Sequence, residues 1–145
     1  MTPENVLPLL LLALGLLAAV VFFLRRGRGP QSGGEPAWIE ANELAAKLNT
    51  GAGSVIDVRG PDEFTGELGH IANASNLPVG ELAGRLTEIN ALKEGPVILV
   101  CRTDKRSANA SAILRDAGFQ DVSVLRGGMV EWNRSGLPVE GRNAA

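Results

Sequence analysis

Short apolar runs alternate with stretches of helical spacing between residues 37 and 140. Three runs are predicted to be strands because they are short and rich in β-branched or apolar side chains. They are residues 54–58, 96–100 and 122–125. The run 96–100 (Pro-Val-Ile-Leu-Val) carries no polar side chain. Such a run is typical of a strand buried on both faces of a parallel sheet.

Four helices are predicted between or beside these runs. Asn42 is expected to cap a short first helix that carries Leu44, Ala45 and Leu48 on one face. The remaining helices are expected over residues 81–92, over residues 107–117 with Gly118 as a left-handed cap, and just after Gly127-Gly128. Residues 60–79 are predicted to be irregular. Strands that alternate with helices indicate an α/β domain with a mostly parallel sheet.

The N-terminal part has a different pattern. Residues 6–24 contain no charged side chain. As a helix they would be about 28 Å long, close to the hydrocarbon thickness of a bilayer. A cleaved signal peptide would carry positive charge before its apolar core, whereas here Arg25, Arg26 and Arg28 follow it. We therefore expect an uncleaved, single-pass transmembrane anchor. The alternative is a buried helix of a soluble protein.

This anchor implies a domain layout and an orientation. We expect an anchor over residues 1–26, a flexible Gly- and Pro-rich linker over 27–36, a globular domain over 37–140 and a disordered tail over 141–145. Lys and Arg residues that flank a transmembrane segment usually stay on the cytoplasmic side of the membrane. The N-terminus is thus expected outside and the globular domain in the cytoplasm.

Composition excludes several classes of function. The net charge is −2 and the chain has no tyrosine, so nucleic acid is not expected as a partner. A single cysteine rules out an intrachain disulfide, and no Cys/His cluster is present that could hold zinc.

That one cysteine, Cys101, is the main candidate for chemistry. It ends the apolar run 96–100 and opens a basic loop that leads into the helix predicted from Ser107. Cationic neighbours and the amino end of a helix both favour a thiolate. The turn should direct its backbone amides inward as an anion site, with charge added by Arg102, Lys105 and Arg106. Ser107 is expected to cap the helix and could donate a hydrogen bond to the thiolate. The alternative is that Cys101 is a small buried hydrophobe.

Other polar residues are expected to gather at the same edge. In parallel sheets chemistry collects at the carboxyl ends of strands, where residues 57–59, Cys101 and residues 126–128 all fall. For Arg59 we favour an internal ion pair, for example with Glu63, over a role in the pocket. His70 is expected to be a hydrogen-bonded structural residue. Two aromatic residues, Phe64 and Trp132, are expected in the core.

Four motifs resemble those of the rhodanese family, in the same order along the chain. They are Val55–Arg59 with Glu63-Phe64, Gly69–Ala74 with Asn76–Pro78, Cys101–Ser107, and Leu125–Gly128 with Trp132. The third is similar to the family's active-site loop, which has six residues, starts with the nucleophilic cysteine and ends in Arg followed by Ser or Thr. The resemblance covers most of residues 37–138.

The resemblance implies a rhodanese-like three-layer α/β domain with a mostly parallel sheet of about five strands, here preceded by one transmembrane helix. It also implies a thiosulfate sulfurtransferase-like enzyme. Cys101 would take the outer sulfur of a small anionic donor such as thiosulfate and pass it, as a persulfide, to a thiol or protein acceptor. The donor would be bound by the loop, that is, by Arg102, Thr103, Asp104, Lys105, Arg106 and Ser107. No metal or organic cofactor is implied.

One residue departs from the family pattern, and two other functions stay open. Many members carry Gly where Asp104 stands. Asp tolerates a left-handed backbone, but its charge would oppose an anionic donor. The first alternative function is a non-enzymatic binding or sulfur-carrier module that serves a membrane partner. The second is a cysteine phosphatase or arsenate reductase, whose loop is one residue longer than Cys101–Arg106.

Overall fold

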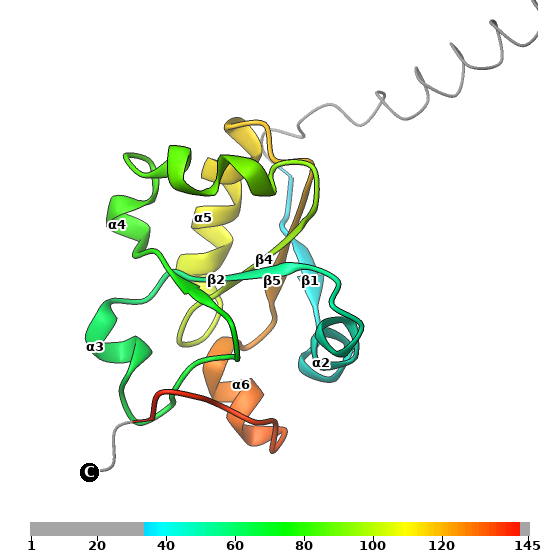
Figure 1. Ribbon diagram of the computed structural model, residues 1–145, viewed down its shortest axis with the longest axis vertical. Coiled ribbons are helices and arrows are strands. Elements are labelled where there is room, and N and C mark those ends of the chain that lie inside the picture. Colours follow the sequence, from blue (N-terminus) through cyan, green and yellow to red (C-terminus); the bar gives the residue numbers. More distant parts are fainter. Residues whose placement is uncertain (1–33, 143–145) are drawn as a thin grey trace, which may run out of the picture. The chain divides into compact units, whose positions relative to one another are not determined.

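The computed structural model describes residues 34–142 (Figure 1). Its centre is a sheet of five strands in the order β1-β5-β4-β2-β3, and every pair of neighbouring strands is parallel. The strands are β1 (Ala37–Ile39), β2 (Ser54–Asp57), β3 (Ser75–Asn76), β4 (Pro96–Val100) and β5 (Asp121–Leu125). This confirms the predicted α/β domain with a parallel sheet.

Within residues 34–142, five α-helices and one 3-10 helix lie between or after these strands. They are α2 (Ala41–Asn49), α3 (Pro61–Phe64), α4 (Val79–Leu82), the 3-10 helix η2 (Leu86–Leu92), α5 (Lys105–Asp116) and α6 (Gly128–Arg134). Figure 1 shows α4 and α5 on one side of the sheet and α2 on the other. The domain therefore has three layers.

Strand β4 is central to the domain. It pairs with β2 on one side and with β5 on the other, so that Leu99 aligns with both Ile56 and Val124. Its side chains alternate between two hydrophobic clusters. Val97 and Leu99 point to the cluster under α4, η2 and α5, whereas Ile98 points to the cluster under α2 and α6. A strand buried on both faces was the prediction from its all-apolar sequence.

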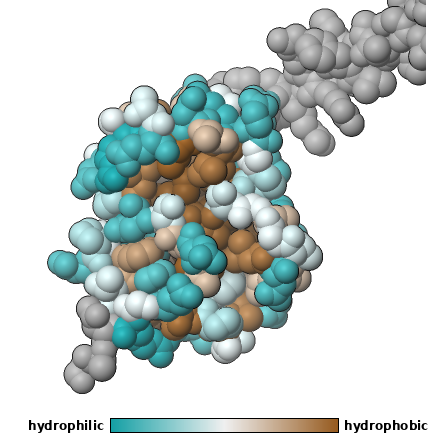
Figure 2. Space-filling model, in the orientation of Figure 1, coloured by the Kyte–Doolittle hydropathy of each residue, from teal (hydrophilic) through white to brown (hydrophobic). Residues whose placement is uncertain are grey.

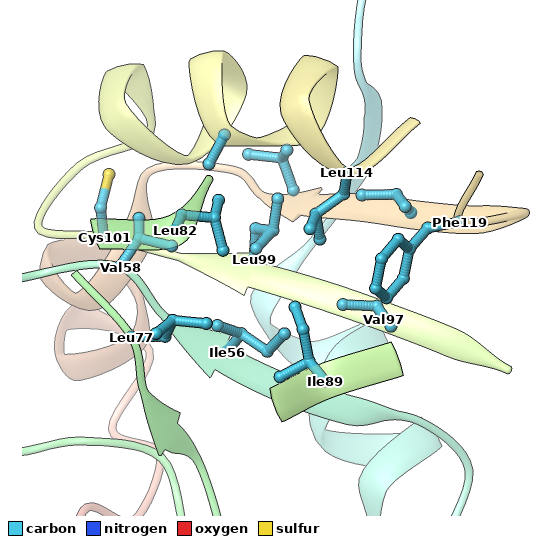
Figure 3. Close-up of a cluster of buried hydrophobic side chains, with 13 residues drawn as sticks. Ile56, Val58, Leu77, Leu82, Ile89, Val97, Leu99, Cys101, Leu114 and Phe119 are labelled. Carbon is cyan, nitrogen blue, oxygen red and sulfur yellow. The ribbon is translucent and has the colours of Figure 1, made fainter. Parts of the chain in front are cut away.

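The first of these clusters extends to the carboxyl end of β4 (Figure 3). Leu82 from α4 and Leu114 from α5 cover Leu99, and Phe119 closes the end near Val97. Cys101 lies at the opposite end of the same cluster. In Figure 2 hydrophobic residues reach the surface in the middle of the visible face, and hydrophilic residues surround them.

Several predicted element boundaries were wrong. The first helix begins at Ala41, so Glu40 rather than Asn42 is its N-cap residue, and it makes no side-chain cap. The helix expected over residues 81–92 is instead two short elements, α4 and η2, with Gly84 between them. Glycine weakens a helix because it loses the most conformational freedom on folding.

Strands β1 and β3 were not predicted, and β2 ends one residue before Val58. β1 and β3 have three and two residues, too few for a periodic pattern to be recognised. Both lie at the edges of the sheet, where pairing on one side is enough to hold them.

The irregular segment after β2 is held by a buried ion pair. Arg59 is 1% exposed, and its Nη2 lies 2.6 Å from Asp57 Oδ2. The same guanidinium donates to the backbone oxygens of Glu63 (3.0 Å) and Gly69 (2.7 Å). An ion pair of Arg59 was expected, but its partner is Asp57. Glu63 takes part only through its carbonyl.

His70 ties the same segment to the end of the described chain. Its Nδ1 lies 3.0 Å from the backbone oxygen of Phe64, and the two rings stack with centroids 3.7 Å apart. Its backbone pairs with Glu140 in both directions, at 3.0 and 2.9 Å. These contacts agree with the expected structural role. Phe64 is half-buried, and Trp132 is a core residue at 3% exposure.

Within residues 34–142, no helix has the length and apolar character needed to cross a membrane. The apolar run 6–24 lies outside the described residues, so the transmembrane anchor stays a prediction.

Candidate active site

The candidate nucleophile, Cys101, directly follows β4. The residue is 1% exposed because the apolar cluster covers it on the side of the sheet. Figure 3 shows its sulfur at the edge of that cluster, close to the loop that leads into α5. The parallel register of β4 with β2 and β5 therefore brings the thiol to the carboxyl edge of the sheet, where sites of α/β proteins form.

The loop after Cys101 is attached to α6 by its carbonyl groups. Met129 N donates to Cys101 O at 2.9 Å, and Val130 N donates to Arg102 O at 3.0 Å. Gly128 lets the two segments approach so closely. Its φ is +58°, and a Cβ there would collide with the carbonyl oxygens of Thr103 and Cys101. Only glycine fits this position without displacing the loop.

The amides of the loop consequently face the other way. In a planar trans peptide, the C=O of one residue and the N–H of the next point in opposite directions. Since the carbonyls of Cys101 and Arg102 point to α6, the N–H groups of Arg102 and Thr103 point away from it. No hydrogen bond from the N–H of residues 102, 103 or 104 to any acceptor within residues 34–142 is present.

The first turn of α5 adds more free donors. The N–H groups at the start of a helix have no partner inside the helix. Here they follow the loop directly, because α5 begins at Lys105. Free amides of a turn beside the positive end of a helix dipole form a site for an anion.

Ser107 contacts the thiol from α5. Its Oγ lies 3.3 Å from Cys101 Sγ and donates to Asp104 O at 2.9 Å. Ser107 is fully buried. It was expected to cap the helix, but α5 begins two residues earlier, so Asp104 is at the N-cap position. The expected contact between Ser107 and the sulfur is present.

Two of the three loop cations are paired with carboxylates. Arg106 makes a two-point contact with Glu63, at 2.7 and 2.8 Å. This hydrogen bonding lowers the pKa of Glu63 and raises that of Arg106 from their usual values. Arg102 lies 3.3 Å from Glu67 on the surface. Lys105 is exposed and has no ion pair among the residues that the structure describes. Carboxylates therefore neutralise two of the three positive charges that the sequence places in the loop.

Asp104 does not need the left-handed backbone considered for it. Its φ is −156°, and Asn73 is the one non-glycine residue with positive φ in the described chain. Its Oδ2 accepts a hydrogen bond from Gly127 N at 3.2 Å. The side chain thus reaches the turn between β5 and α6, on the side of the loop that carries the carbonyl groups.

All three strand ends expected to meet lie at this edge of the sheet. Asp57 aligns with Val100, and Val58 N donates to Val100 O at 2.8 Å, next to Cys101. The turn at residues 126–128 contacts the loop through Gly127 and Gly128. The side chains of Asp57 and Arg59, however, bind each other and the segment 60–69. Sequence reasoning missed Glu63 as the partner of Arg106. These residues are 43 positions apart, and no local spacing rule connects them.

Of two cavities in the described domain, one adjoins the loop and the other does not. One of about 250 Å³ adjoins the loop at Arg102 and is lined also by Glu63, Glu67 and Leu68. A larger one of about 590 Å³ lies between α2 and the start of β2 and contains no residue of the loop. Across residues 34–142, no group of three or more His, Cys, Asp or Glu side chains is placed to hold a metal ion.

Comparison with known proteins agrees with this architecture. The Rhodanese-like domain family matches residues 40–135. The chain therefore belongs to the rhodanese-like domain family, as its motifs suggested.

The chain is 35% identical over 102 residues to a protein named Sulfurtransferase from Allochromatium vinosum, covering 70% of this chain and 92% of that one. It is 37% identical over 100 residues to an HTH-type transcriptional regulator, Rv0324, from Mycobacterium tuberculosis, covering 68% and 42%. Among solved structures, the human single-domain sulfurtransferase TSTD1 matches with a TM-score of 0.60 and 27% identity, covering 70% and 97%. The chain spans between 42% and 59% of the length of three of the curated relatives that it matches.

Proposed function

We propose that this protein is a sulfurtransferase in which Cys101 is the nucleophile. The Cys101 thiolate attacks the outer sulfur of thiosulfate and forms an S–S bond. The S–S bond of thiosulfate breaks, and its electron pair leaves with sulfite. The products are a Cys101 persulfide and SO₃²⁻, so charge and sulfur atoms balance. Relatives named sulfurtransferase support sulfur transfer at the level of the family.

The observation that carries this proposal is the orientation of the loop. Its carbonyls at Cys101 and Arg102 bind α6, and its amides have no acceptor in the described chain. Such amides can hold the oxyanions of the donor during the attack and the negative terminal sulfur afterwards. The Ser107 hydroxyl, 3.3 Å from the sulfur of Cys101, can donate a hydrogen bond to the thiolate and to the persulfide anion. In this proposal the donor is held by the loop, residues 102–107.

The second half of the reaction needs an acceptor outside the chain. The sequence contains one cysteine, so a persulfide on Cys101 has no second thiol within the chain to attack it. A thiophilic acceptor attacks the terminal sulfur, takes it, and returns Cys101 as thiolate. With cyanide the products are thiocyanate and the free enzyme. In the cell we propose a thiol or a protein as acceptor.

We further propose that this transfer takes place at a membrane surface. The run 6–24 and the arginines that follow it support a single-pass anchor over residues 1–26, with the N-terminus outside. A linker over 27–36 then connects it to a domain over 37–140, followed by a short tail over 141–145. A cytoplasmic domain suits a working thiol, because that compartment is reducing.

Alkaline carbonate extraction of the full chain tests the anchor. We expect the chain in the membrane pellet, and a Leu12→Arg/Leu16→Arg variant in the supernatant. Protease added to inverted vesicles should digest the domain, whereas protease added to intact spheroplasts should not. A wild-type chain in the supernatant, or the reverse protease pattern, would contradict the proposed location.

A thiosulfate:cyanide assay tests the enzymatic proposal. We expect thiocyanate from the wild-type chain and none from Cys101→Ser. Persulfide formation without multiple turnovers would favour the sulfur-carrier module instead. Hydrolysis of an aryl phosphate with no persulfide would favour the phosphatase alternative. Thiocyanate formation that survives Cys101→Ser would remove Cys101 from the mechanism.

A further inference from the structure

We propose that Asp104 is a positioning residue, which orients the loop amides by holding the second half of the loop against the turn before α6. This inference rests on the proposed function of the loop as the binding site of an anionic donor. It assigns a role to the residue that departs from the family pattern.

The loop has separate attachments along its length. Its first half is held by the two backbone bonds from Met129 and Val130 to the carbonyls of Cys101 and Arg102. Neither bond reaches Asp104. Among the described residues, the hydrogen bond from Gly127 N to Asp104 Oδ2, at 3.2 Å, is the one that ties the second half of the loop to the same turn.

Asp104 also fixes the start of α5. Its carbonyl oxygen accepts from Ala108 N at 2.8 Å and from Ser107 Oγ at 2.9 Å. Its side chain makes no cap on α5 and reaches to Gly127 instead. One residue therefore joins the loop, the amino end of α5 and the amino end of α6.

This geometry changes the expected effect of the negative charge. The carboxylate lies with the carbonyl groups on the α6 side of the loop, whereas the amides of Arg102 and Thr103 point away from α6. The donor would approach from the amide side. The Asp104 carboxylate thus lies on the face of the loop opposite the donor. There it can hold the amides in position without directly repelling the donor.

Asparagine separates the two roles. In Asp104→Asn the amide oxygen can still accept from Gly127 N, but the charge is gone. Asp104→Ala removes both. If the hydrogen bond matters, Asp104→Asn retains function and Asp104→Ala loses it. If the charge repels the donor, both variants improve. Asp121→Ala is the control for net charge, because Asp121 is exposed at the opposite, amino end of β5.

The measurement is Cys101 alkylation of the full chain by iodoacetate and by iodoacetamide at neutral pH. The two reagents differ in one negative charge, so the ratio of their rates reports how well the loop holds an anion, even when the chain does not transfer sulfur. We expect this ratio to fall about tenfold in Asp104→Ala, the effect of losing one hydrogen bond to a charged group. We expect it to stay within about twofold of wild type in Asp104→Asn and to be unchanged in Asp121→Ala.

Steady-state kinetics with thiosulfate provide the second readout. The KM should rise in Asp104→Ala and return towards wild type in Asp104→Asn. A ratio that rises in both variants, or falls equally in both, would overturn the proposal. If wild type forms no persulfide, the proposed function fails, but the alkylation ratio still tests the role of Asp104.

Discussion

The Sγ of Cys101, just after β4, and the Oγ of Ser107, in the first turn of α5, lie 3.3 Å apart, and both are buried. The Ser107 hydroxyl also donates to Asp104 O. It has one proton, so when the sulfur carries a proton, the thiol donates to Ser107. When the sulfur is a thiolate or a persulfide anion, the hydroxyl can turn and donate to it. The serine thus responds to the charge of the nucleophile.

Ser107→Ala is therefore expected to slow the reaction of Cys101. Losing a hydrogen bond to a charged sulfur should lower the alkylation rate by iodoacetamide at neutral pH about tenfold. Ser111→Ala is the matched control. Ser111 is equally buried on α5, but its Oγ donates to Ala108 O at 2.7 Å, and the side-chain hydrogen bond of Cys101 is to Ser107. Equal losses in the two variants would show that the effect is one of helix packing.

Gly128→Ala is expected to abolish persulfide formation. Its Cβ would collide with the carbonyl oxygens of Thr103 and Cys101 and push the loop off α6. Gly136→Ala controls for backbone strain, because Gly136 also has positive φ (+70°) but open space around its Cβ position. The control should lose about 1–2 kcal/mol of unfolding free energy and keep its activity. Mass spectrometry and thermal unfolding measure the two effects. Full persulfide formation in Gly128→Ala would show that the loop does not depend on its close contact with α6.

Arg59→Leu alone is expected to lower the free energy of unfolding by about 3–5 kcal/mol, because it leaves the buried Asp57 carboxylate without its partner. The double variant Asp57→Leu/Arg59→Leu should lose less than the sum of the two single variants. Urea unfolding of the four proteins measures the coupling. Additive losses would show that the two charges act independently, against the structure.

Glu63→Gln is expected to lower thermal stability at neutral pH but not in acid. Arg106 holds the pKa of Glu63 below its usual value of 4.5. A carboxylate with a lowered pKa stabilises the fold above that usual value, and its contribution is lost as the pH falls through the folded pKa. The gap in melting temperature between wild type and Glu63→Gln should therefore narrow once the pH falls below 4.5 and close below the folded pKa. Glu67→Gln, whose pair with Arg102 is exposed, should show little gap at any pH. A constant gap for Glu63→Gln would mean that its charge does not matter.

The sequence predicted the parts of the fold that have long or strongly patterned signals. The all-apolar run of β4 and the glycine that ends α5 are examples, as Gly118 does have positive φ. The two short edge strands have no such signal. Their formation depends on neighbours such as Leu125, which aligns with Ile39 of β1.

For the candidate site, the sequence indicated the loop but not its supports. The residues of the loop are contiguous, so Cys101 and Ser107 could be placed together from spacing alone. The contacts of Asp104 with Gly127 and of Arg106 with Glu63 join segments that are distant along the chain. They follow from the parallel sheet, which gathers strand ends from separate parts of the sequence. For this reason the partner of Arg106 could not be inferred beforehand.

Intact mass spectrometry of the full chain after exposure to thiosulfate is the most direct test of the central claim. We predict a gain of one sulfur atom, located on Cys101 by peptide mapping and removed by cyanide. The Cys101→Ser protein should show no gain. An unmodified wild-type chain, or a sulfur that is still gained by Cys101→Ser, would contradict the proposal that Cys101 carries the transferred sulfur.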